Sequence, residues 1–302
     1  MRCCTTDCQK TDIFSLLTSH SSLLMSEYQK ICEHAASVGG QILRDMLGNV
    51  EVREKGRADL VTDADFAAQK AIRDIVLGAY PDHAFLGEES DMQSGTEHWQ
   101  PGTLRCGRRN TRSVETGSSG FRWIVDPLDG TTNFVHGVPL FASSVALAHG
   151  NDVICGTVYN PMLEEFFTAA RGQGAFLSGQ PIRISNVTEF SEALASVSFP
   201  TTTESDSPDL LAFLKLVPLA QAIRRTGSTA INLAYIAAGR FDLMICYGSN
   251  AWDVAAGVLL VQEAGGVISD PSGSPFDLDK GATLASATKT LHDKTVQLIN
   301  ER

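Results

Sequence analysis

The chain has 302 residues, of which 43% are hydrophobic and 20% are charged, a composition typical of a globular protein and not of a disordered or fibrous one. The length excludes a small disulfide-stapled or metal-stapled fold, and no segment has the run of about 18 apolar residues that a membrane span needs. The formal net charge of −11 argues against a broad electropositive surface for nucleic acid or anionic lipid. Seven cysteines without paired spacing beyond the N-terminus indicate a reducing compartment, so we expect a cytoplasmic protein.

The N-terminal region shows where the folded part is expected to start. Residues 1–24 are rich in Ser and Thr and carry only a broken apolar stretch, which predicts a disordered extension and not a signal peptide. Ser26 begins a helix-capping sequence. From Tyr28 onward, apolar residues recur at three- and four-residue spacing, which predicts an amphipathic helix that ends near Gly48.

The next segments read as short elements interrupted by an insertion. Leu60-Val61 is predicted to be extended, and Thr62 to Asp65 opens a second helix. The polar, Gly-rich and Arg-rich residues 93–120 are too many for a routine connection and are predicted to form an exposed insertion. Strands are expected after it at 123–125, 143–148, 153–159, 165–169 and 195–199.

The last third changes rhythm, because helical patterns now alternate with short strands. We predict helices at 209–217, 228–238, 254–264 and 289–300, with strands at 241–246, 267–269 and 283–285. This alternation indicates α/β layering. We therefore predict an α/β fold, an α+β layered sandwich of the αβαβα kind, in which a β-rich N-terminal lobe (about 25–190) packs on an α/β C-terminal lobe (191–302).

The densest chemical signal is Asp126-Pro-Leu-Asp129-Gly-Thr-Thr-Asn. A buried strand delivers Asp126 at its C-terminal end, Pro127 suits a first helical turn, and Asp129 follows on the same side. Gly130 and Thr131 then stand at a helix N-terminus, which favours phosphate. Hard oxygen ligands beside an anion site are what magnesium-dependent phosphoryl chemistry requires, whereas the simpler interpretation is a turn made by Asp, Pro and Gly.

Three further acidic elements favour the metal interpretation. Glu88 follows an apolar run, Asp65 stands at a helix start, and Asp253 stands at the head of a later helix. Each alone is most often a cap or a surface residue. The aspartyl-phosphate mechanism is disfavoured, because its nucleophile would occupy position 127, which is proline.

These blocks, in this order, resemble those of the inositol monophosphatase family of magnesium-dependent, lithium-sensitive phosphatases. The resemblance runs from about Met25 to the C-terminus, as one phosphatase domain of residues 25–302. It implies hydrolysis of a small phosphorylated metabolite, a phosphate monoester, by a metal-activated water. Members of the family are often homodimers.

Carried over residue by residue, the resemblance implies two Mg²⁺ ions and an ordered phosphate. The first ion is held by Glu88, Asp126 and the Leu128 carbonyl, and the second by Asp126, Asp129 and Asp253, while Glu88 also touches a third, weaker ion. Asp65 pairs with Thr131, and this pair or Glu88 orients the water. The amides of Gly130 and Thr131 bind phosphate with Gly227 and Ser228 nearby, and Lys55 lies close by on a flexible loop.

Cys246 is where the match fails. Members that act on inositol phosphate carry a glutamate seven residues before the Trp-Asp aspartate, and a thiol is a weak hydrogen-bond partner for a sugar hydroxyl. Histidinol phosphate, 3′-phosphoadenosine nucleotides, sugar bisphosphates and NADP are therefore alternative substrates. Arg225 is placed for a second phosphate or, equally, for solvent. The arginines of the insertion form either a basic flap or, as we favour, a solvated loop.

The rival interpretation is a non-catalytic interaction protein on the same fold. Such a protein is expected to lose at least one metal ligand. The presence of Glu88, Asp126, Asp129, Thr131 and Asp253 favours an enzyme.

Overall fold

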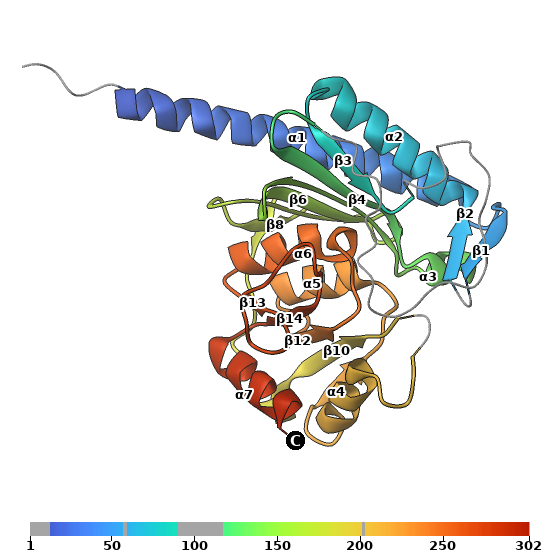
Figure 1. Ribbon diagram of the computed structural model, residues 1–302, viewed down its shortest axis with the longest axis vertical. Coiled ribbons are helices and arrows are strands. Elements are labelled where there is room, and N and C mark those ends of the chain that lie inside the picture. Colours follow the sequence, from blue (N-terminus) through green and yellow to red (C-terminus); the bar gives the residue numbers. More distant parts are fainter. Residues whose placement is uncertain (1–12, 57–58, 90–116, 201–202, 302) are drawn as a thin grey trace, which may run out of the picture.

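The computed structural model describes residues 13–56, 59–89, 117–200 and 203–301, and for 13–26, 55, 56 and 59 it describes the backbone alone. Helices and sheets stack in five layers (Figure 1). Helices α1 (Ile13–Met46) and α2 (Asp63–Ala79) cover one face of a seven-stranded sheet, and α5 (Thr229–Ala237) and α6 (Ala251–Glu263) lie on its other face. A five-stranded sheet and the outer helices α4 (Pro208–Leu216) and α7 (Lys289–Asn300) complete the stack. The predicted αβαβα sandwich is confirmed.

The large sheet has the strand order β3-β4-β5-β6-β7-β8-β9 and is antiparallel apart from the β3–β4 pair. Its strands are β3 (Ala84–Gly87), β4 (Phe121–Asp129), β5 (Ala142–His149), β6 (Asp152–Asn160), β7 (Glu165–Ala170), β8 (Ala175–Leu177) and β9 (Gln180–Ile182).

The small sheet has the order β11-β10-β12-β14-β13, and a separate hairpin pairs β1 with β2. The bounds are β1 (Val52–Gly56), β2 (Asp59–Thr62), β10 (Leu194–Ser198), β11 (Ala222–Arg224), β12 (Leu243–Cys246), β13 (Val267–Ser269) and β14 (Thr283–Ser286). Strands β10, β11 and β12 are parallel, so their carboxyl ends lie at one edge. Short helices α3 (Thr131–Val135) and η2 (Phe190–Glu192) complete the chain.

Helix α1 begins earlier than predicted. It runs without interruption from Ile13 through Ser26, so the predicted start at Ser26 is wrong, because the 26–29 sequence continues an existing helix and does not cap a new one. Residues 1–12 of the predicted extension lie outside the described residues. Most of the predicted insertion, residues 93–116 with all its arginines, also lies outside them.

Strand β4 departs from the prediction at Pro127. Asp126 pairs with Ser144 and Asp129 with Ala142, so β4 fits one more residue than β5 into this stretch. A proline cannot donate to the ladder, and a bulge is one of the few places in a sheet that accept it. The prediction that Pro127 opens a helical turn is therefore wrong, since the helix starts only at Thr131.

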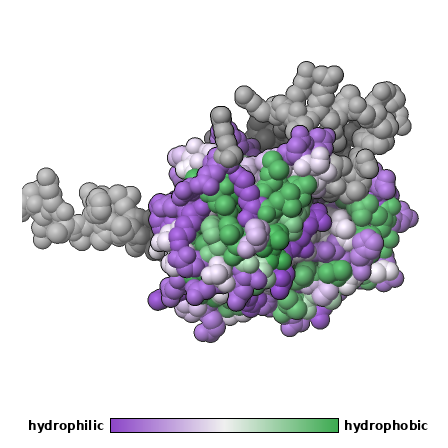
Figure 2. All heavy atoms as spheres, turned by 90° about the horizontal axis from the view of Figure 1, so that it is seen from below, coloured by the Kyte–Doolittle hydropathy of each residue, from purple (hydrophilic) through white to green (hydrophobic). Residues whose placement is uncertain are grey.

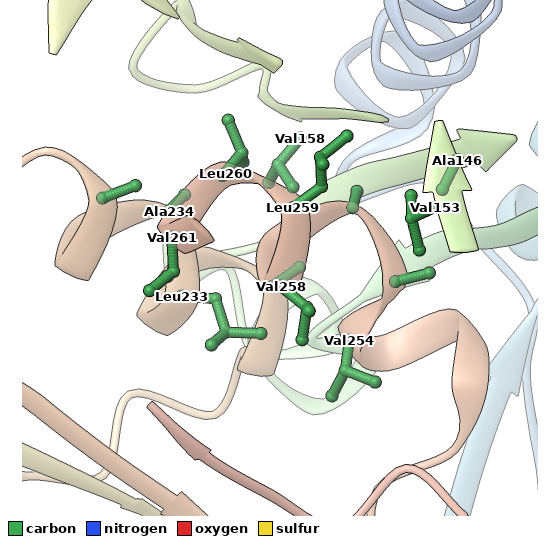
Figure 3. Close-up of a cluster of buried hydrophobic side chains, with 14 of the residues drawn as sticks. Ala146, Val153, Val158, Leu233, Ala234, Val254, Val258, Leu259, Leu260 and Val261 are labelled. Carbon is green, nitrogen blue, oxygen red and sulfur yellow. The ribbon is translucent and has the colours of Figure 1, made fainter. Parts of the chain in front are cut away.

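The core between the two sheets is built on α5 and α6. Figure 3 shows Val254, Val258 and Leu259 of α6 among apolar side chains from α5 and from the large sheet. A helix that lies between two sheets has no face left for solvent, which explains why ten of the thirteen residues of α6 are buried. This burial holds the N-terminus of α6, and with it Asp253, against the large sheet.

Apolar side chains also reach the surface. Figure 2 looks onto the end of the molecule where α4 and α7 lie, and it shows apolar side chains gathered among polar ones. The exposed apolar residues of α4 and the turn after it are Leu211, Leu214, Val217 and Leu219. Within the described part of the chain, no helix is long and apolar enough to cross a membrane.

Contact between β6 and α6 gives the first prediction. A Cβ at Gly156 would lie 2.8 Å from the Cα of Ala256, so Gly156→Ala forces the helix away from the sheet. We expect it to lower the free energy of unfolding by about 1–3 kcal/mol, measured by urea denaturation. Gly78→Ala, at an exposed position of helix α2 where a Cβ meets nothing within 4 Å, should instead stabilise by about 0.5–1 kcal/mol. A neutral Gly156→Ala would contradict this packing.

Candidate active site

Glu88 and Asp126 are brought together by the parallel register of β3 and β4. Gly87 pairs with Val125, so the next residues on the two strands, Glu88 and Asp126, stand side by side. The Glu88 N–H donates to the Val125 carbonyl at 3.1 Å. The side chains of Glu88 and Asp126 share a hydrogen bond. Two carboxyl groups can share a hydrogen bond only when a proton lies between them. Without that proton, a cation would be needed to offset the repulsion between the two carboxylates.

Asp129 links the two lobes. Its Oδ2 accepts hydrogen bonds from the Ser228 hydroxyl at 2.5 Å and from the Ala230 N–H at 2.6 Å, and its Oδ1 accepts one from the Thr229 N–H at 3.2 Å. These donors form the N-terminus of α5, where unpaired N–H groups favour a negative charge. A carboxylate on the large sheet thus caps a helix of the second lobe.

Asp253 occupies the first turn of α6. Its Oδ2 accepts a hydrogen bond from the Asn250 N–H at 2.6 Å, which closes a capping box at the helix start. Asn250 follows the end of β12 by four residues. The carboxyl edge of the small sheet therefore delivers Asp253 toward the end of β4, where Asp126 lies.

Burial and mutual repulsion raise the pKa values of these aspartates. Burial is the main cause for Asp126, whose pKa lies well above its usual range, and the charge of Glu88 is the second. Burial followed by the charge of Glu88 raises the pKa of Asp253 to about 8. Burial also raises the pKa of Asp129, to about 6, although its hydrogen bonds at the start of α5 lower it. Four carboxylates from three separate segments, the end of β3, β4 and the start of α6, therefore act on one another in a buried place.

The donor set suits a divalent cation, although the arrangement is not a closed coordination shell. Among the residues that the structure describes, no group of three or more His, Cys, Asp or Glu side chains is arranged to hold a metal ion. Asp129 and Asp253 direct oxygens toward helix N–H groups. The set nevertheless consists of hard oxygen donors that repel one another, and a cation such as Mg²⁺ would offset that repulsion.

The predicted Asp65–Thr131 pair has different hydrogen bonds in the structure. Asp65 is buried at the start of α2, and its Oδ2 accepts hydrogen bonds from the N–H and the hydroxyl of Thr62. The Thr131 hydroxyl donates to the Leu128 carbonyl at 3.1 Å. A threonine hydroxyl has one proton, so a bond to Asp65 requires that this hydroxyl rotates. The same bond occupies the Leu128 carbonyl, which was predicted to be a metal ligand.

The loop predicted to bind phosphate is tightly constrained. Gly130 has φ +97°, in the left-handed region, and a Cβ there would lie 3.0 Å from the Leu140 carbonyl oxygen, so a side chain is excluded. Gly227 has φ +86° and packs against the side-chain amide of Asn133. Ser228 follows as the N-cap of α5. The residues predicted to surround the phosphate thus belong to two loops in contact.

The remaining predicted substrate residues lie at strand ends. Cys246 ends β12, and burial raises the pKa of its thiol to about 12, so it is a neutral thiol. Arg225 directly follows β11, is exposed, and places its guanidinium 5.4 Å from the centre of the Phe199 ring. Lys55 belongs to β1, and its side chain lies outside the described residues.

Asn133 and Thr226 were missed as site residues by the sequence reasoning. The Asn133 side chain donates to the Thr226 carbonyl at 2.8 Å and to the Leu140 carbonyl at 2.6 Å. The only sequence signal was the position of Asn133 inside the Asp126–Asn133 block. The contact with Thr226 joins distant parts of the chain, and no local pattern could have shown it.

Comparisons with known proteins identify the family of this chain. A model of the inositol monophosphatase family matches residues 24–302. Nus factor SuhB of Pseudomonas aeruginosa is 40% identical over 260 residues, which cover 84% of this chain and 89% of that protein. Inositol monophosphatase 2 of Solanum lycopersicum is 36% identical over 282 residues, which cover 92% and 99%.

A solved structure has the same fold. The crystal structure of the extragenic suppressor protein SuhB from Bartonella henselae superposes with a TM-score of 0.79 at 33% identity and covers 91% of this chain and 99% of that chain. The similarity therefore extends over most of both chains and shows that they share one fold.

The raised pKa of Asp253 predicts how the metal-free protein responds to pH. The pKa of an aspartate in an unfolded chain is about 4, whereas the pKa of Asp253 in the folded protein is about 8. Its contribution to stability is therefore complete below about pH 4 and is lost as the pH rises through 8. We expect the thermal midpoint in chelator to fall between about pH 4 and 8 and then to level off, and Asp253→Asn to flatten that fall. A midpoint that rises with pH in both proteins would contradict the assignment.

Proposed function

This chain belongs to the inositol monophosphatase family and is a phosphoric monoester hydrolase, and we propose that its catalytic centre is the group formed by Glu88, Asp126, Asp129 and Asp253. The observation that carries the proposal is the mutual electrostatic interaction of these carboxylates, which come from β3, β4 and the start of α6. A structural role alone does not account for them, because uncompensated buried charges cost stability.

The residues of the proposed centre have separate tasks. Glu88, Asp126, the Leu128 carbonyl, Asp129 and Asp253 hold cations. Gly130 and Thr131 offer backbone N–H groups to the phosphate, with Gly227 and Ser228 beside them. Asp65 accepts the proton of the Thr131 hydroxyl once that hydroxyl leaves Leu128, and either this pair or Glu88 orients the attacking water.

The family is metal-dependent, generally on Mg²⁺, and the donor set of this chain fits such a requirement. When bound, Mg²⁺ supplies the positive charge that activates water and offsets the charge on the leaving oxygen. We propose two Mg²⁺ ions, with a third and weaker one near Glu88. The protein contributes position and electrostatics, which is the usual division of labour in phosphoryl transfer.

We propose a small phosphorylated metabolite as the substrate, of the inositol 1-phosphate kind. Support comes from relatives that are named inositol monophosphatases. Cys246 weakens the case for inositol itself, because its buried, neutral thiol offers little to a sugar hydroxyl. Histidinol phosphate, a 3′-phosphoadenosine nucleotide and a sugar bisphosphate remain the alternatives within the same chemistry, and Arg225 would favour the last.

A second role as an interaction protein is favoured by one observation, the similarity to a protein named Nus factor. That role needs the surface of the fold and not the carboxylates. The retention of all four carboxylates supports catalysis beside any such role.

Cellular location and assembly are further parts of the proposal. The described cysteines Cys32, Cys155 and Cys246 are free thiols, which supports a reducing, cytoplasmic location. A homodimer, as is common in the family, stays a prediction that light scattering tests directly.

Replacement of one carboxylate tests the centre. We expect Asp126→Asn to lower kcat for p-nitrophenyl phosphate by at least about a hundredfold, because it removes a charge that holds the cations. Asp242→Asn is the matched control. Asp242 is also buried and hydrogen-bonded, but its partners are Ser185 and the Leu194 N–H. Phosphate release is measured with and without Mg²⁺. Equal rates for wild type and Asp126→Asn would sink the proposed centre.

Substitution at Cys246 tests the substrate assignment. We expect Cys246→Glu to raise kcat/KM for inositol 1-phosphate, relative to p-nitrophenyl phosphate, by on the order of tenfold, the worth of one hydrogen bond to a charged group. Cys246→Ser, which keeps the size, is the control and should change the ratio little. If wild type already strongly prefers inositol 1-phosphate and Cys246→Glu does not raise that preference, then Cys246 does not disfavour inositol.

A further inference from the structure

We propose that Asn133 is a positioning residue for the hydrolase reaction, which fixes the loop around Gly130 and the start of α5 relative to each other through one side-chain amide. The inference rests on the proposed function, because it presupposes that these two loops surround the reacting phosphate. It assigns a role to a residue that neither coordinates a cation nor reaches the phosphate.

The first contact of Asn133 closes its own loop. After α3 the chain turns back toward β5, and the Asn133 Nδ2 donates to the Leu140 carbonyl at 2.6 Å. The Asn133 carbonyl accepts a hydrogen bond from the Val138 N–H at 2.8 Å. A Cβ on Gly130 would lie 3.0 Å from the carbonyl oxygen of the same Leu140. Asn133 thereby holds the backbone that presses on Gly130.

The second contact crosses to the other lobe. The same Nδ2 donates to the Thr226 carbonyl at 2.8 Å. A Cβ on the following residue, Gly227, would stand 2.9 Å from the Asn133 Nδ2 and 3.0 Å from its Oδ1, so the Gly227 backbone lies directly on the amide. Ser228, which comes next, donates to Asp129.

Together these contacts close a ring across the lobes. The chain runs from Asp129 through Gly130 into α3, where Asn133 lies. The Asn133 side chain is hydrogen-bonded to the Thr226 carbonyl. Two residues further along the chain, the Ser228 hydroxyl donates a hydrogen bond to Asp129. Each link is a hydrogen bond or a few covalent residues, so Asn133 adds a second tie between the two loops beside the Ser228–Asp129 bond. A displacement of about 1 Å at a reacting centre can cost about a hundredfold in rate, which is why this link matters for catalysis.

The chemistry of the link requires an amide. Both partners are backbone carbonyls, which only accept, so the bridging atom must carry two N–H bonds. An aspartate at this position would place a charged acceptor against two carbonyl oxygens and would push both loops away. An alanine would release both loops and leave two part-buried carbonyls to water.

A matched control exists far from the site. The Asn300 Nδ2 on α7 also donates to two backbone carbonyls, those of Pro271 at 3.0 Å and Val296 at 2.8 Å. Asn300→Asp thus removes the same two kinds of hydrogen bond on a helix that carries no proposed site residue, although Asn300 is exposed and solvent screens the added charge more than at half-buried Asn133. Comparison of the two variants separates the positioning effect from the general cost of a broken bridge.

The test compares Asn133→Asp, Asn133→Ala and Asn300→Asp with wild type, each assayed well below its own thermal midpoint. We expect both Asn133 variants to lose kcat on p-nitrophenyl phosphate by on the order of tenfold to a hundredfold. The rise in thermal midpoint on addition of Mg²⁺ with inorganic phosphate should shrink in parallel. Asn300→Asp should keep the wild-type kcat and the full rise in midpoint, even if its basal midpoint falls.

Two outcomes would overturn the inference: Asn133 variants with the kcat and ligand-induced midpoint of wild type, or Asn133 and Asn300 variants that lose activity alike. If Asn133→Asp does not fold, Asn133→Ala decides by the same criteria. Failure of the proposed function has a different result, since Asp126→Asn would then remain as active as wild type whatever the Asn133 variants do.

Discussion

The constraint on which this structure depends is the repulsion between buried carboxylates. Asp126 and Asp253 come from elements of two different lobes, and burial first, then the charge of Glu88, raises the pKa of each. A globular protein ordinarily avoids such a cluster, because each uncompensated charge in the interior costs several kcal/mol (about 3–5 for a broken pair). The fold accepts the strain because apolar packing of α6 between two sheets fixes the helix start irrespective of the charges around it. The cations proposed for this centre would then offset the repulsion that packing alone imposes.

Asp129 shows how the same strain is partly relieved by the protein itself. Its carboxylate receives three hydrogen bonds from the start of α5, and these lower a pKa that burial raises. The same bonds tie the large sheet to a helix of the second lobe. A residue proposed to hold a cation is therefore also a joint between lobes, so its replacement would disturb geometry and charge together. Substitutions at Asp126 and Asp253, which do not bond to the start of α5, therefore report more directly on the effect of removing a charge.

Much of the fold was predictable from sequence because many of its helices and strands have a recognisable local pattern of apolar residues. The period of apolar residues predicted α7 with its observed bounds, and β13 likewise. The start of α1 was not predictable, because a capping sequence at Ser26 looks the same inside a continuing helix. The bulge at Pro127 was missed for a related reason: a proline after a strand suits a helical turn or a bulge equally, and only pairing with β5 decides. The carboxylates were found through motif order, whereas the Asn133–Thr226 contact required the tertiary structure.

The arrangement also explains how one chemistry can serve several substrates. The groups proposed to hold cations and phosphate cluster around the end of β4 and the starts of α3, α5 and α6. The positions proposed to meet the leaving group, Cys246 at the end of β12 and Arg225 just after β11, lie at the carboxyl edge of the small sheet, which also leads to Asp253. This is the edge at which open α/β sheets usually bind ligands. Ser198 pairs with Cys246 across this edge, and neither position belongs to the carboxylate cluster. The charge of Asp253 nevertheless acts on Cys246, so the position proposed to select the substrate is electrostatically linked to the centre proposed to cleave it.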